Sequence, residues 1–379
     1  MELKISTAFD GGNIEVIEAS QADNIRLKIR PDAHSHFYQW FYFRVVAAPN
    51  TELTLHLENA GEAAYPGGWQ NYAAVISYDL KSWTRTPTRF HEGVLTIQAA
   101  TGPGSVYVAY FAPYTAEQHR SLVALAGQIS GAEVLVLGQT LDGRDLDLIK
   151  IDRTPDRPKP KLWITARQHP GETMAEWWME GLIERLARTD DPEVETLLQS
   201  ATLFLVPNMN PDGSARGHLR TNAAGVNLNR EWQAPSLHKS PEVFLVREKM
   251  QDEGIDLALD VHGDEALPYN FIAGTEGIAS WSDRLADLLE TFKQTYVTAS
   301  DGAFQTAKGY PVNPPGKANL NICSNALAAD FDCLAMTLEM PFKDDANHPD
   351  AHWGWSPERS KKLGAESVAP MLSVLPKLR

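Results

Sequence analysis

The sequence predicts an α/β domain with a central mixed sheet flanked by helices, preceded by a smaller all-β sandwich domain. At 379 residues the chain is longer than one average domain and long enough for two domains, each with its own core. Its first hundred or so residues carry short strand patterns with no helices between them, whereas strand and helix patterns alternate in the rest. We therefore expect a β-sandwich over residues 1–112 and an α/β domain over residues 113–379.

Short runs of alternating or apolar residues, separated by Pro, Gly and Asn, fill the amino-terminal region. Strands without intervening helices close a core most simply as two packed sheets. The run YFAPYT at 110–115 ends this region. The runs predict strands over 25–29, 40–46, 53–57, 73–78 and 94–98.

The α/β region combines apolar runs of the length of buried strands with longer helical patterns. Ser240-Pro241 and Ser356-Pro357 each place a serine cap before a proline at the first helical position. The strands are predicted over 133–137, 161–166, 201–207, 257–261 and 334–338. The helices are predicted over 117–129, 173–187, 241–253 and 278–295, and from residue 357 onward.

Charge and composition exclude several classes of partner. The formal net charge of −15 argues against nucleic acid and against an anionic membrane. No run approaches eighteen uncharged apolar residues, and the first residues lack the apolar core of a signal peptide, so we expect a cytoplasmic protein. Cys323 and Cys333 are the two cysteines, and we expect both to stay reduced as small apolar residues.

Three predicted strands lead to residues with metal-site or acid–base chemistry. Strand 161–166 leads to His169, strand 257–261 to His262, and strand 334–338 to Glu339. In open α/β sheets, ligand-binding groups gather at the carboxyl ends of the strands. The sequence therefore predicts that these side chains meet at one edge of the sheet.

A zinc site is predicted within this group. His169 and Glu172 are three residues apart in RQHPGE, at a turn from which both can face one point. Catalytic zinc commonly has three protein ligands, and two histidines with one glutamate are an established set. His262 is the best second histidine, since its strand would neighbour that of His169. Asp260 either orients a ligating imidazole or is a solvated carboxylate at a strand end.

Five motifs in order extend this prediction: HPGE, NPDG (210–213), GVNLNREW (225–232), DVHG (260–263) and TLEMPF (337–342). With them the chain resembles the M14 metallocarboxypeptidases, and most closely the cytosolic carboxypeptidase branch, whose eukaryotic members trim glutamate from tubulin tails. The resemblance covers about residue 110 to the carboxyl terminus. The run FYQWFYFRV also resembles the β-sandwich that precedes the peptidase in that branch.

The resemblance implies one zinc ion per chain, held by His169, Glu172 and His262, in agreement with the ligand count. It implies Glu339 as the general base that takes a proton from the water activated by zinc and delivers it to the leaving amine. The implied substrate is the C-terminal peptide or isopeptide bond of a peptide or protein.

The resemblance also implies residues for binding and stabilisation. Arg220 matches the arginine that stabilises the oxyanion, and Asn229 and Arg230 match the clamp for the free carboxylate, tasks that suit a planar charged donor. Tyr310 is only a loose positional match to the mobile tyrosine of pancreatic-type enzymes. Lys317 lies roughly where glutamate-trimming relatives carry a cation, which suggests an acidic C-terminal residue.

Other interpretations stay open at this point. A zinc amidase or deacylase acting on small N-acyl substrates could use the same ligands, although such enzymes usually carry HGNE and lack the sandwich. A non-catalytic peptide-binding module is a second alternative, but every expected catalytic position is filled. Asp264 and Glu265 are left without a role, and the oligomeric state is left open.

Overall fold

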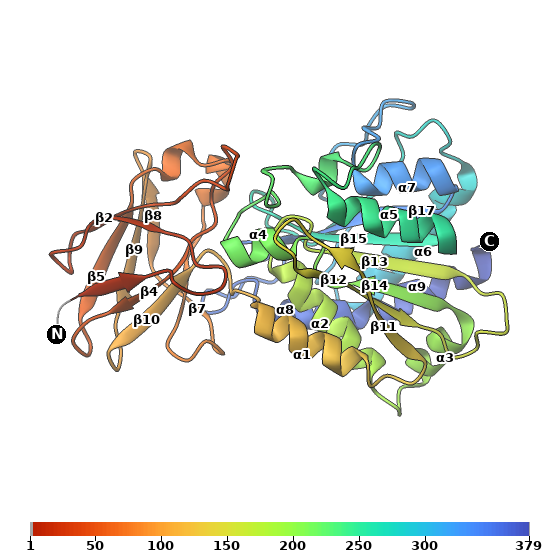
Figure 1. Cartoon of the computed structure of the whole chain (residues 1–379), viewed down its shortest axis with the longest axis horizontal. Helices are drawn as coiled ribbons and strands as arrows, with labels where there is room; N and C mark the ends of the chain where they lie inside the picture. Colours follow the sequence, from red (N-terminus) through yellow and green to blue (C-terminus); the bar gives the residue numbers. More distant parts are fainter. Residues whose placement is uncertain (1–2, 379) are drawn as a thin grey trace.

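The computed structural model describes residues 3–378 and contains an all-β region followed by a region of strands and helices (Figure 1). Residues 110–115 connect the last strand of the first region to the first helix of the second. The predicted domain boundary between residues 112 and 113 falls in this connection and stays a prediction. Within residues 3–378, no helix combines the length and apolar character needed to cross a membrane.

Two five-stranded sheets make up the amino-terminal region, with strand orders β1-β4-β10-β6-β7 and β2-β3-β5-β9-β8. Alternate side chains of β3 and β5 are buried, as the period-2 patterns predicted. The five predicted strands are present, and five further strands join them. The bounds are β1 (Lys4–Ser6), β2 (Glu15–Glu18), β3 (Ile25–Lys28), β4 (Tyr42–Val46), β5 (Glu52–Leu57), β6 (Val75–Ser77), β7 (Thr84–Arg85), β8 (Thr88–His91), β9 (Val94–Ala100) and β10 (Ser105–Ala109).

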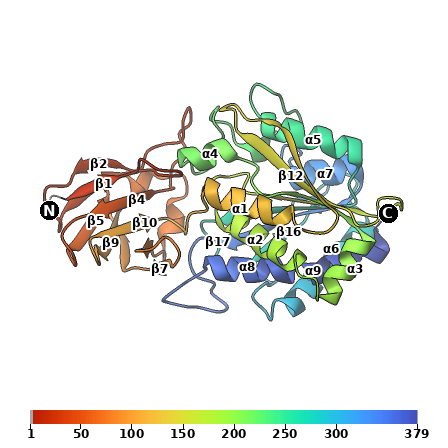
Figure 2. The same cartoon turned by 60° about the horizontal axis from the view of Figure 1, so that its bottom comes forward.

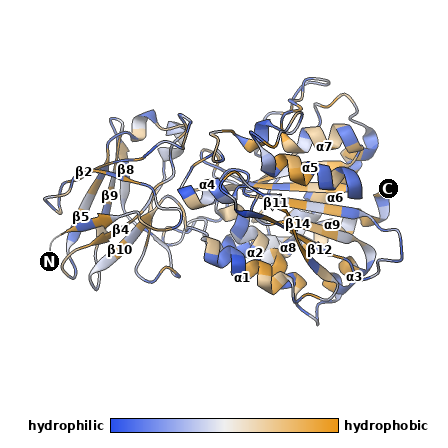
Figure 3. Ribbon diagram, viewed as in Figure 1, coloured by the Kyte–Doolittle hydropathy of each residue, from blue (hydrophilic) through white to orange (hydrophobic). Residues whose placement is uncertain are grey.

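A seven-stranded mixed sheet forms the centre of the second region, in the order β11-β12-β14-β13-β15-β17-β16. The four strands β14, β13, β15 and β17 are parallel, and the outer pairings are antiparallel. The parallel strands are almost wholly buried and coloured as hydrophobic in Figure 3, which explains their continuous apolar runs. The bounds are β11 (Ala132–Gln139), β12 (Asp145–Ile151), β13 (Lys161–Ala166), β14 (Thr202–Val206), β15 (Leu257–Asp264), β16 (Phe271–Ala273) and β17 (Leu334–Pro341).

Helices cover both faces of this sheet. Figure 2 shows α5 and α7 on one face and α1, α2, α6, α8 and α9 on the other. The α-helix bounds are α1 (Ala116–Ala126), α2 (Met174–Leu186), α3 (Pro192–Ser200), α4 (Pro211–Arg216), α5 (Pro241–Glu253), α6 (Asp283–Ala299), α7 (Cys323–Phe331), α8 (Pro357–Glu366) and α9 (Val368–Val374). The 3₁₀ turns are η1 (Ala60–Glu62), η2 (Pro66–Trp69), η3 (Leu228–Arg230) and η4 (Leu375–Lys377).

The helix starts predicted at Pro241 and Pro357 are confirmed, whereas the start predicted at residue 278 is wrong. Ser356 caps α8 by accepting the backbone N–H of Arg359. Ser240 occupies the cap position of α5, but its hydroxyl oxygen accepts the backbone N–H of Ser236 instead of a helix amide, and its hydroxyl donates to the Glu231 carboxylate. The helix predicted over 278–295 begins only after Ser282, which caps it. Cys323 and Cys333 are free and buried, as expected.

The two regions are joined by contacts to backbone atoms. The Arg85 guanidinium donates to the carbonyl oxygens of Phe342 and Trp355, each at 2.9 Å. The Tyr110 and Phe342 rings stack with centroids 4.5 Å apart. Since Phe342 follows β17 closely, this contact fixes the sandwich against the end of the strand that carries Glu339.

A buried ionic network lies beneath the turn that follows β13. His119 on α1 lies between the carboxylates of Glu176, at 2.6 Å, and Asp147, at 3.0 Å. Arg167 donates to the other oxygen of Glu176 at 2.7 Å and to the carbonyl of Pro170 at 2.9 Å. Burial disfavours the charged imidazole, but the hydrogen bonds that it donates to the carboxylates of Asp147 and Glu176 outweigh this effect and raise the pKa of His119 to about 9.

Replacing His119 by Asn should reduce stability in a pH-dependent way. Because the folded-state pKa lies above the unfolded value near 6.5, the stabilisation is fully present below about pH 6.5 and is lost as the pH rises through about 9. Urea unfolding of the wild type and His119→Asn should therefore differ most at pH 6 and least at pH 9.5. His91→Asn, at an exposed site, is the control. A difference that stays constant or grows with pH would contradict the charged network.

Candidate active site

The parallel register of the central sheet brings the predicted strand ends together. In the pairing of β15 with β17, His262 lies directly opposite Glu339. β13 pairs with β15 on the other side, with Ala166 opposite Val261, so the turn carrying His169 begins at the same edge. The prediction that these groups meet at the carboxyl edge of the sheet is confirmed.

A tight turn after β13 presents His169 and Glu172 on one side. The backbone N–H of Glu172 donates to the carbonyl of His169, and Gly171 donates to the carbonyl of Leu219 at 2.9 Å. A side chain at position 171 would place its Cβ 2.9 Å from that same oxygen, so the close approach requires glycine. The chain can therefore hold both side chains against the neighbouring loop.

His169, Glu172 and His262 form a compact buried group. Nδ1 of His169 lies 2.7 Å from Glu172 Oε1, and Nδ1 of His262 lies 2.7 Å from Glu172 Oε2. The two Nδ1 atoms are 3.2 Å apart. In residues 3–378 this is the one group of His, Cys, Asp or Glu side chains with the spacing of a metal site.

The outer nitrogens of both imidazoles face oxygen acceptors. Nε2 of His169 lies 3.0 Å from Asn227 Oδ1, and Nε2 of His262 lies 2.8 Å from Asp260 Oδ2. Since these oxygens only accept, each Nε2 carries a proton, which leaves Nδ1 of each histidine as the nitrogen that could bind a metal ion beside Glu172.

Asp260 is a buried orienting group for His262, which decides between the two interpretations left open by the sequence. It is 2% exposed, so it is no solvated strand-end carboxylate. Its oxygens also accept hydrogen bonds from Thr165 Oγ1 at 2.8 Å and from Gln168 Nε2. An acceptor held in this way fixes the orientation and tautomer of the imidazole.

The electrostatics of the group favour a positive charge between its members. Burial, with Arg220 nearby, lowers the pKa of His169 to about 4. Burial opposes ionisation of Glu172, but the two imidazoles hold its pKa well below the usual range. Burial also opposes a charged His262, yet Asp260 and Glu172 raise its pKa well above 6.5. The raised pKa of His262 therefore places a proton between its Nδ1 and Glu172, at a position that a metal cation could take instead.

Glu339 lies next to this group with one oxygen free of protein partners. The Tyr310 hydroxyl lies 3.2 Å from Glu339 Oε1 and 2.6 Å from Asp264 Oδ2. Glu339 Oε2 is buried without a hydrogen-bond partner. Burial raises the pKa of Glu339 well above its ordinary value, with Glu172 adding to the rise and His262 opposing it. This carboxylate is placed to exchange protons with a group in the cavity.

The three predicted recognition residues line one cavity of about 580 Å³ together with Glu339 and Tyr310. Arg220 Nη1 lies 3.9 Å from Glu172 Oε1. Arg230 donates to the carbonyl of Asn229 at 2.6 Å. Asn229 is itself held by the backbone N–H of Cys323, which donates to its Oδ1 at 2.8 Å.

Lys317 does not join them. It is exposed and absent from the residues that line the cavity within the described chain. Lys293 on α6 and Lys308 line the cavity instead, together with Glu276. The helical pattern gave Lys293 no functional signal, because its place in the wall depends on how α6 packs.

Two further lining residues were not assigned from the sequence. Tyr65 comes from the amino-terminal region and could not be placed by any local motif. Glu265 was noted but left without a role; burial, followed by repulsion from Glu172, raises its pKa to about 8.

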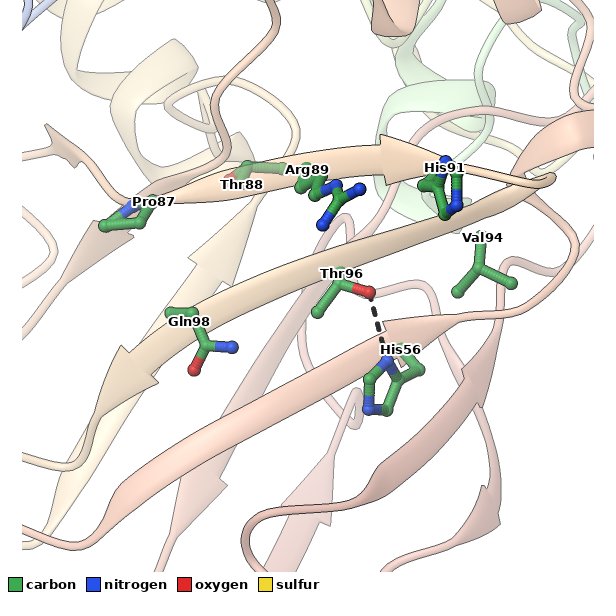
Figure 4. Close-up of a pocket in the computed structure, with 8 residues that line it drawn as sticks. All are labelled: His56, Pro87, Thr88, Arg89, His91, Val94, Thr96 and Gln98. Carbon is green, nitrogen blue, oxygen red and sulfur yellow. Dashed lines mark hydrogen bonds between the residues drawn. The ribbon is translucent and has the colours of Figure 1, made fainter.

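A second cavity, of about 570 Å³, lies on the outer face of the sandwich (Figure 4). Strands β5, β8 and β9 supply its walls, and the His56 imidazole and the Thr96 hydroxyl form a hydrogen bond of 3.1 Å there. The compact metal-type group lies elsewhere, so this cavity carries no comparable chemistry.

Sequence comparison divides the chain into two matches. The profile described as the cytosolic carboxypeptidase N-terminal domain matches residues 5–111, and the profile described as zinc carboxypeptidase matches residues 119–341. An uncharacterized protein of Zymomonas mobilis is 46% identical over 100% of this chain and 98% of its own. Cytosolic carboxypeptidase 6 of Caenorhabditis elegans is 27% identical, over 90% of this chain and 79% of its own.

A solved structure has the same fold over nearly the whole chain. The metallo-carboxypeptidase of Pseudomonas aeruginosa, in complex with (2-guanidinoethylmercapto)succinic acid, superposes with a TM-score of 0.96 at 47% identity, covering 99% of this chain and 100% of the other. Fold and site therefore define a metallocarboxypeptidase. The chain belongs to the M14 zinc carboxypeptidase family and carries the N-terminal domain of its cytosolic branch.

Proposed function

We propose that this metallocarboxypeptidase uses one zinc ion to hydrolyse the C-terminal peptide bond of peptides or proteins. The observation that carries the proposal is the pair of Nδ1 atoms, 3.2 Å apart, that face the single carboxylate of Glu172. Ligand atoms around a tetrahedral zinc ion lie roughly 3.4 Å apart, given metal–ligand distances near 2.1 Å, so the two Nδ1 atoms are close to that separation. His169, Glu172 and His262 thus fit the zinc ion that the family name implies.

When bound, zinc supplies a Lewis acid that polarises the scissile carbonyl and acidifies a water molecule. In the proposal, Glu339 accepts the proton of the attacking water and delivers it to the leaving amine. Its free Oε2 and raised pKa suit a group that cycles between carboxylate and carboxylic acid. Tyr310, through its hydroxyl, orients the other oxygen of Glu339.

In the proposal, the arginines of the cavity bind two oxygen groups of the substrate, one at its C-terminus and one at the scissile bond. In the proposal, Arg230 and Asn229 hold the free C-terminal carboxylate, and Arg220 stabilises the oxyanion that forms on the scissile carbonyl. The separation of Arg220 from Glu172, 3.9 Å, leaves its guanidinium available to a substrate oxygen.

Metal content and activity should separate the role of the ligands from that of Glu339. We expect about one zinc per chain in the wild type and in Glu339→Gln, and much less in His262→Ala. Glu339→Gln should lower kcat by about 10²–10⁴-fold, because it removes the general base. Elemental analysis and peptide hydrolysis measure the two quantities.

Several results would contradict the mechanism. Full activity of Glu339→Gln would show that Glu339 is not the general base. If the purified protein contained no zinc and His169→Ala behaved like the wild type, the proposed metal site would be wrong. Exclusive activity on N-acyl amino acids would make the protein an amidase instead of a peptidase.

If Arg230 and Asn229 bind the substrate carboxylate, the rate of hydrolysis should depend on a free C-terminus in the peptide. Arg230→Met should lower kcat/KM for a free-acid peptide by roughly 10–100-fold, the value of a hydrogen bond to a charged group. The same peptide with an amidated C-terminus should be a poor substrate for both proteins, so the ratio between acid and amide narrows in the variant. Arg89→Met, on the outer face of the sandwich, is the matched control. An unchanged ratio of the kcat/KM values for the acid and amide peptides would show that Arg230 does not bind the C-terminal carboxylate.

We further propose that the enzyme prefers an acidic C-terminal residue. Lys317 no longer supports this preference, but Lys293 and Lys308 place positive charge in the cavity wall. Glu276 lies in the same wall and opposes them. The ligand of the Pseudomonas enzyme carries carboxylates and a guanidine group, which agrees with a pocket of mixed charge.

Peptides ending in Glu, Lys and Phe test this preference. Wild type should cleave the Glu peptide fastest. Lys293→Met should lower that rate by about five-fold and Glu276→Gln should raise it, because an ion pair in a partly open site contributes about 1 kcal/mol. A wild-type preference for Lys or Phe would overturn the acidic pocket.

A further inference from the structure

One carboxylate of the amino-terminal sandwich binds the loop that carries Arg220. Asp32, which is 2% exposed, accepts the backbone N–H groups of Leu219 at 2.6 Å, Arg220 at 2.8 Å and Thr221 at 2.8 Å. It also accepts the Thr221 hydroxyl at 3.0 Å. Three consecutive amides converging on one buried anion fix the direction of the backbone at the residue between them.

The same loop is bound to the metal-site turn on its other side. The carbonyl of Leu219 accepts the N–H of Gly171, which lies between His169 and Glu172. Leu219 therefore connects Asp32 of the sandwich to the turn that presents two of the proposed ligands. Beside it, Ala33 N–H donates to Nε2 of His218 at 3.0 Å, adding a further bond between the regions.

The sandwich also holds the guanidinium itself. The Cζ atom of Arg220 lies 5.3 Å from the centroid of the Tyr65 ring and 5.8 Å from that of Phe37. Cations at such distances are attracted to aromatic faces, more strongly where water is excluded. Gln39, which is fully buried, fixes Tyr65 by accepting its backbone N–H at 2.8 Å and donating to its carbonyl at 3.1 Å.

We propose that the amino-terminal sandwich completes the active site, with Asp32, Phe37 and Tyr65 as positioning residues that aim the Arg220 guanidinium at the reacting carbonyl. This inference rests on the role proposed above for Arg220. The catalytic region alone supplies the arginine but neither the anion that fixes its backbone nor the rings that hold its charge. The sandwich thereby contributes to turnover and not only to stability.

A double-mutant cycle tests this proposal. Asp32→Asn replaces one acceptor oxygen by an NH₂ donor that faces the same amides. It should lower kcat by about 10-fold and change KM by less than about 3-fold, because a misplaced Arg220 guanidinium would stabilise the transition state less well. In the Arg220→Ala background the same change should cost nothing further, because the group it positions is gone. Phe37→Leu should behave in the same way, which keeps the test available if Asp32→Asn folds poorly.

Asp10→Asn is the matched control, because Asp10 also accepts a backbone N–H across the regions, that of Ala116 at 2.7 Å, but away from Arg220. Its kcat should equal that of the wild type. A readout independent of turnover is amide hydrogen exchange over residues 218–224. Exchange there should be faster in Asp32→Asn and unchanged in Arg220→Ala.

The possible results distinguish the role of Arg220 from that of the residues that position it. Full activity of Arg220→Ala would overturn the role of that arginine and this inference with it. Two other results would overturn the positioning role alone. In the first, Arg220→Ala has low activity, but Asp32→Asn still lowers kcat by the same factor in the Arg220→Ala background. In the second, Asp32→Asn leaves amide hydrogen exchange over residues 218–224 unchanged.

Discussion

The parallel pairing of β15 with β17 is the constraint on which the site depends. It sets His262 opposite Glu339, and the pairing of β15 with β13 brings the turn of His169 and Glu172 to the same edge. A slip of one residue in either pairing would send these side chains to opposite faces of the sheet. The buried apolar strands specify this register, so the same residues that form the core fix the geometry of the polar site.

The site also gathers several buried acidic side chains. Glu172, Glu265 and Glu339 lie at its wall, where burial raises the pKa of the latter two while the imidazoles lower that of Glu172. Arg220 faces all three; burial opposes its charge, but Tyr65 and then these glutamates raise its pKa. A divalent ion at Glu172 would relieve the repulsion further, so metal binding and the protonation of the neighbouring glutamates are physically linked.

The sequence predicted those parts of the structure that local patterns encode. Apolar runs located the central strands and their ends, and the motifs around His169 and His262 predicted the compact group that the structure contains. The sequence did not predict contacts that tertiary packing sets. Tyr65 and Asp32 are far from the other site residues in sequence. Lys317 was chosen by its position in the chain, whereas helix packing places Lys293 in the cavity wall. The roles assigned to the site residues stay predictions.

Across the boundary between the two regions, the side chains that bind come largely from the sandwich and the atoms they bind are largely backbone. Asp32 accepts amides, and Arg85 donates to carbonyls beyond β17. Every residue type except proline offers such an amide, and every residue offers a carbonyl. The interface therefore restricts which amino acids the sandwich can carry, yet leaves the facing loops of the peptidase free to diversify their side chains, and with them the substrates they select.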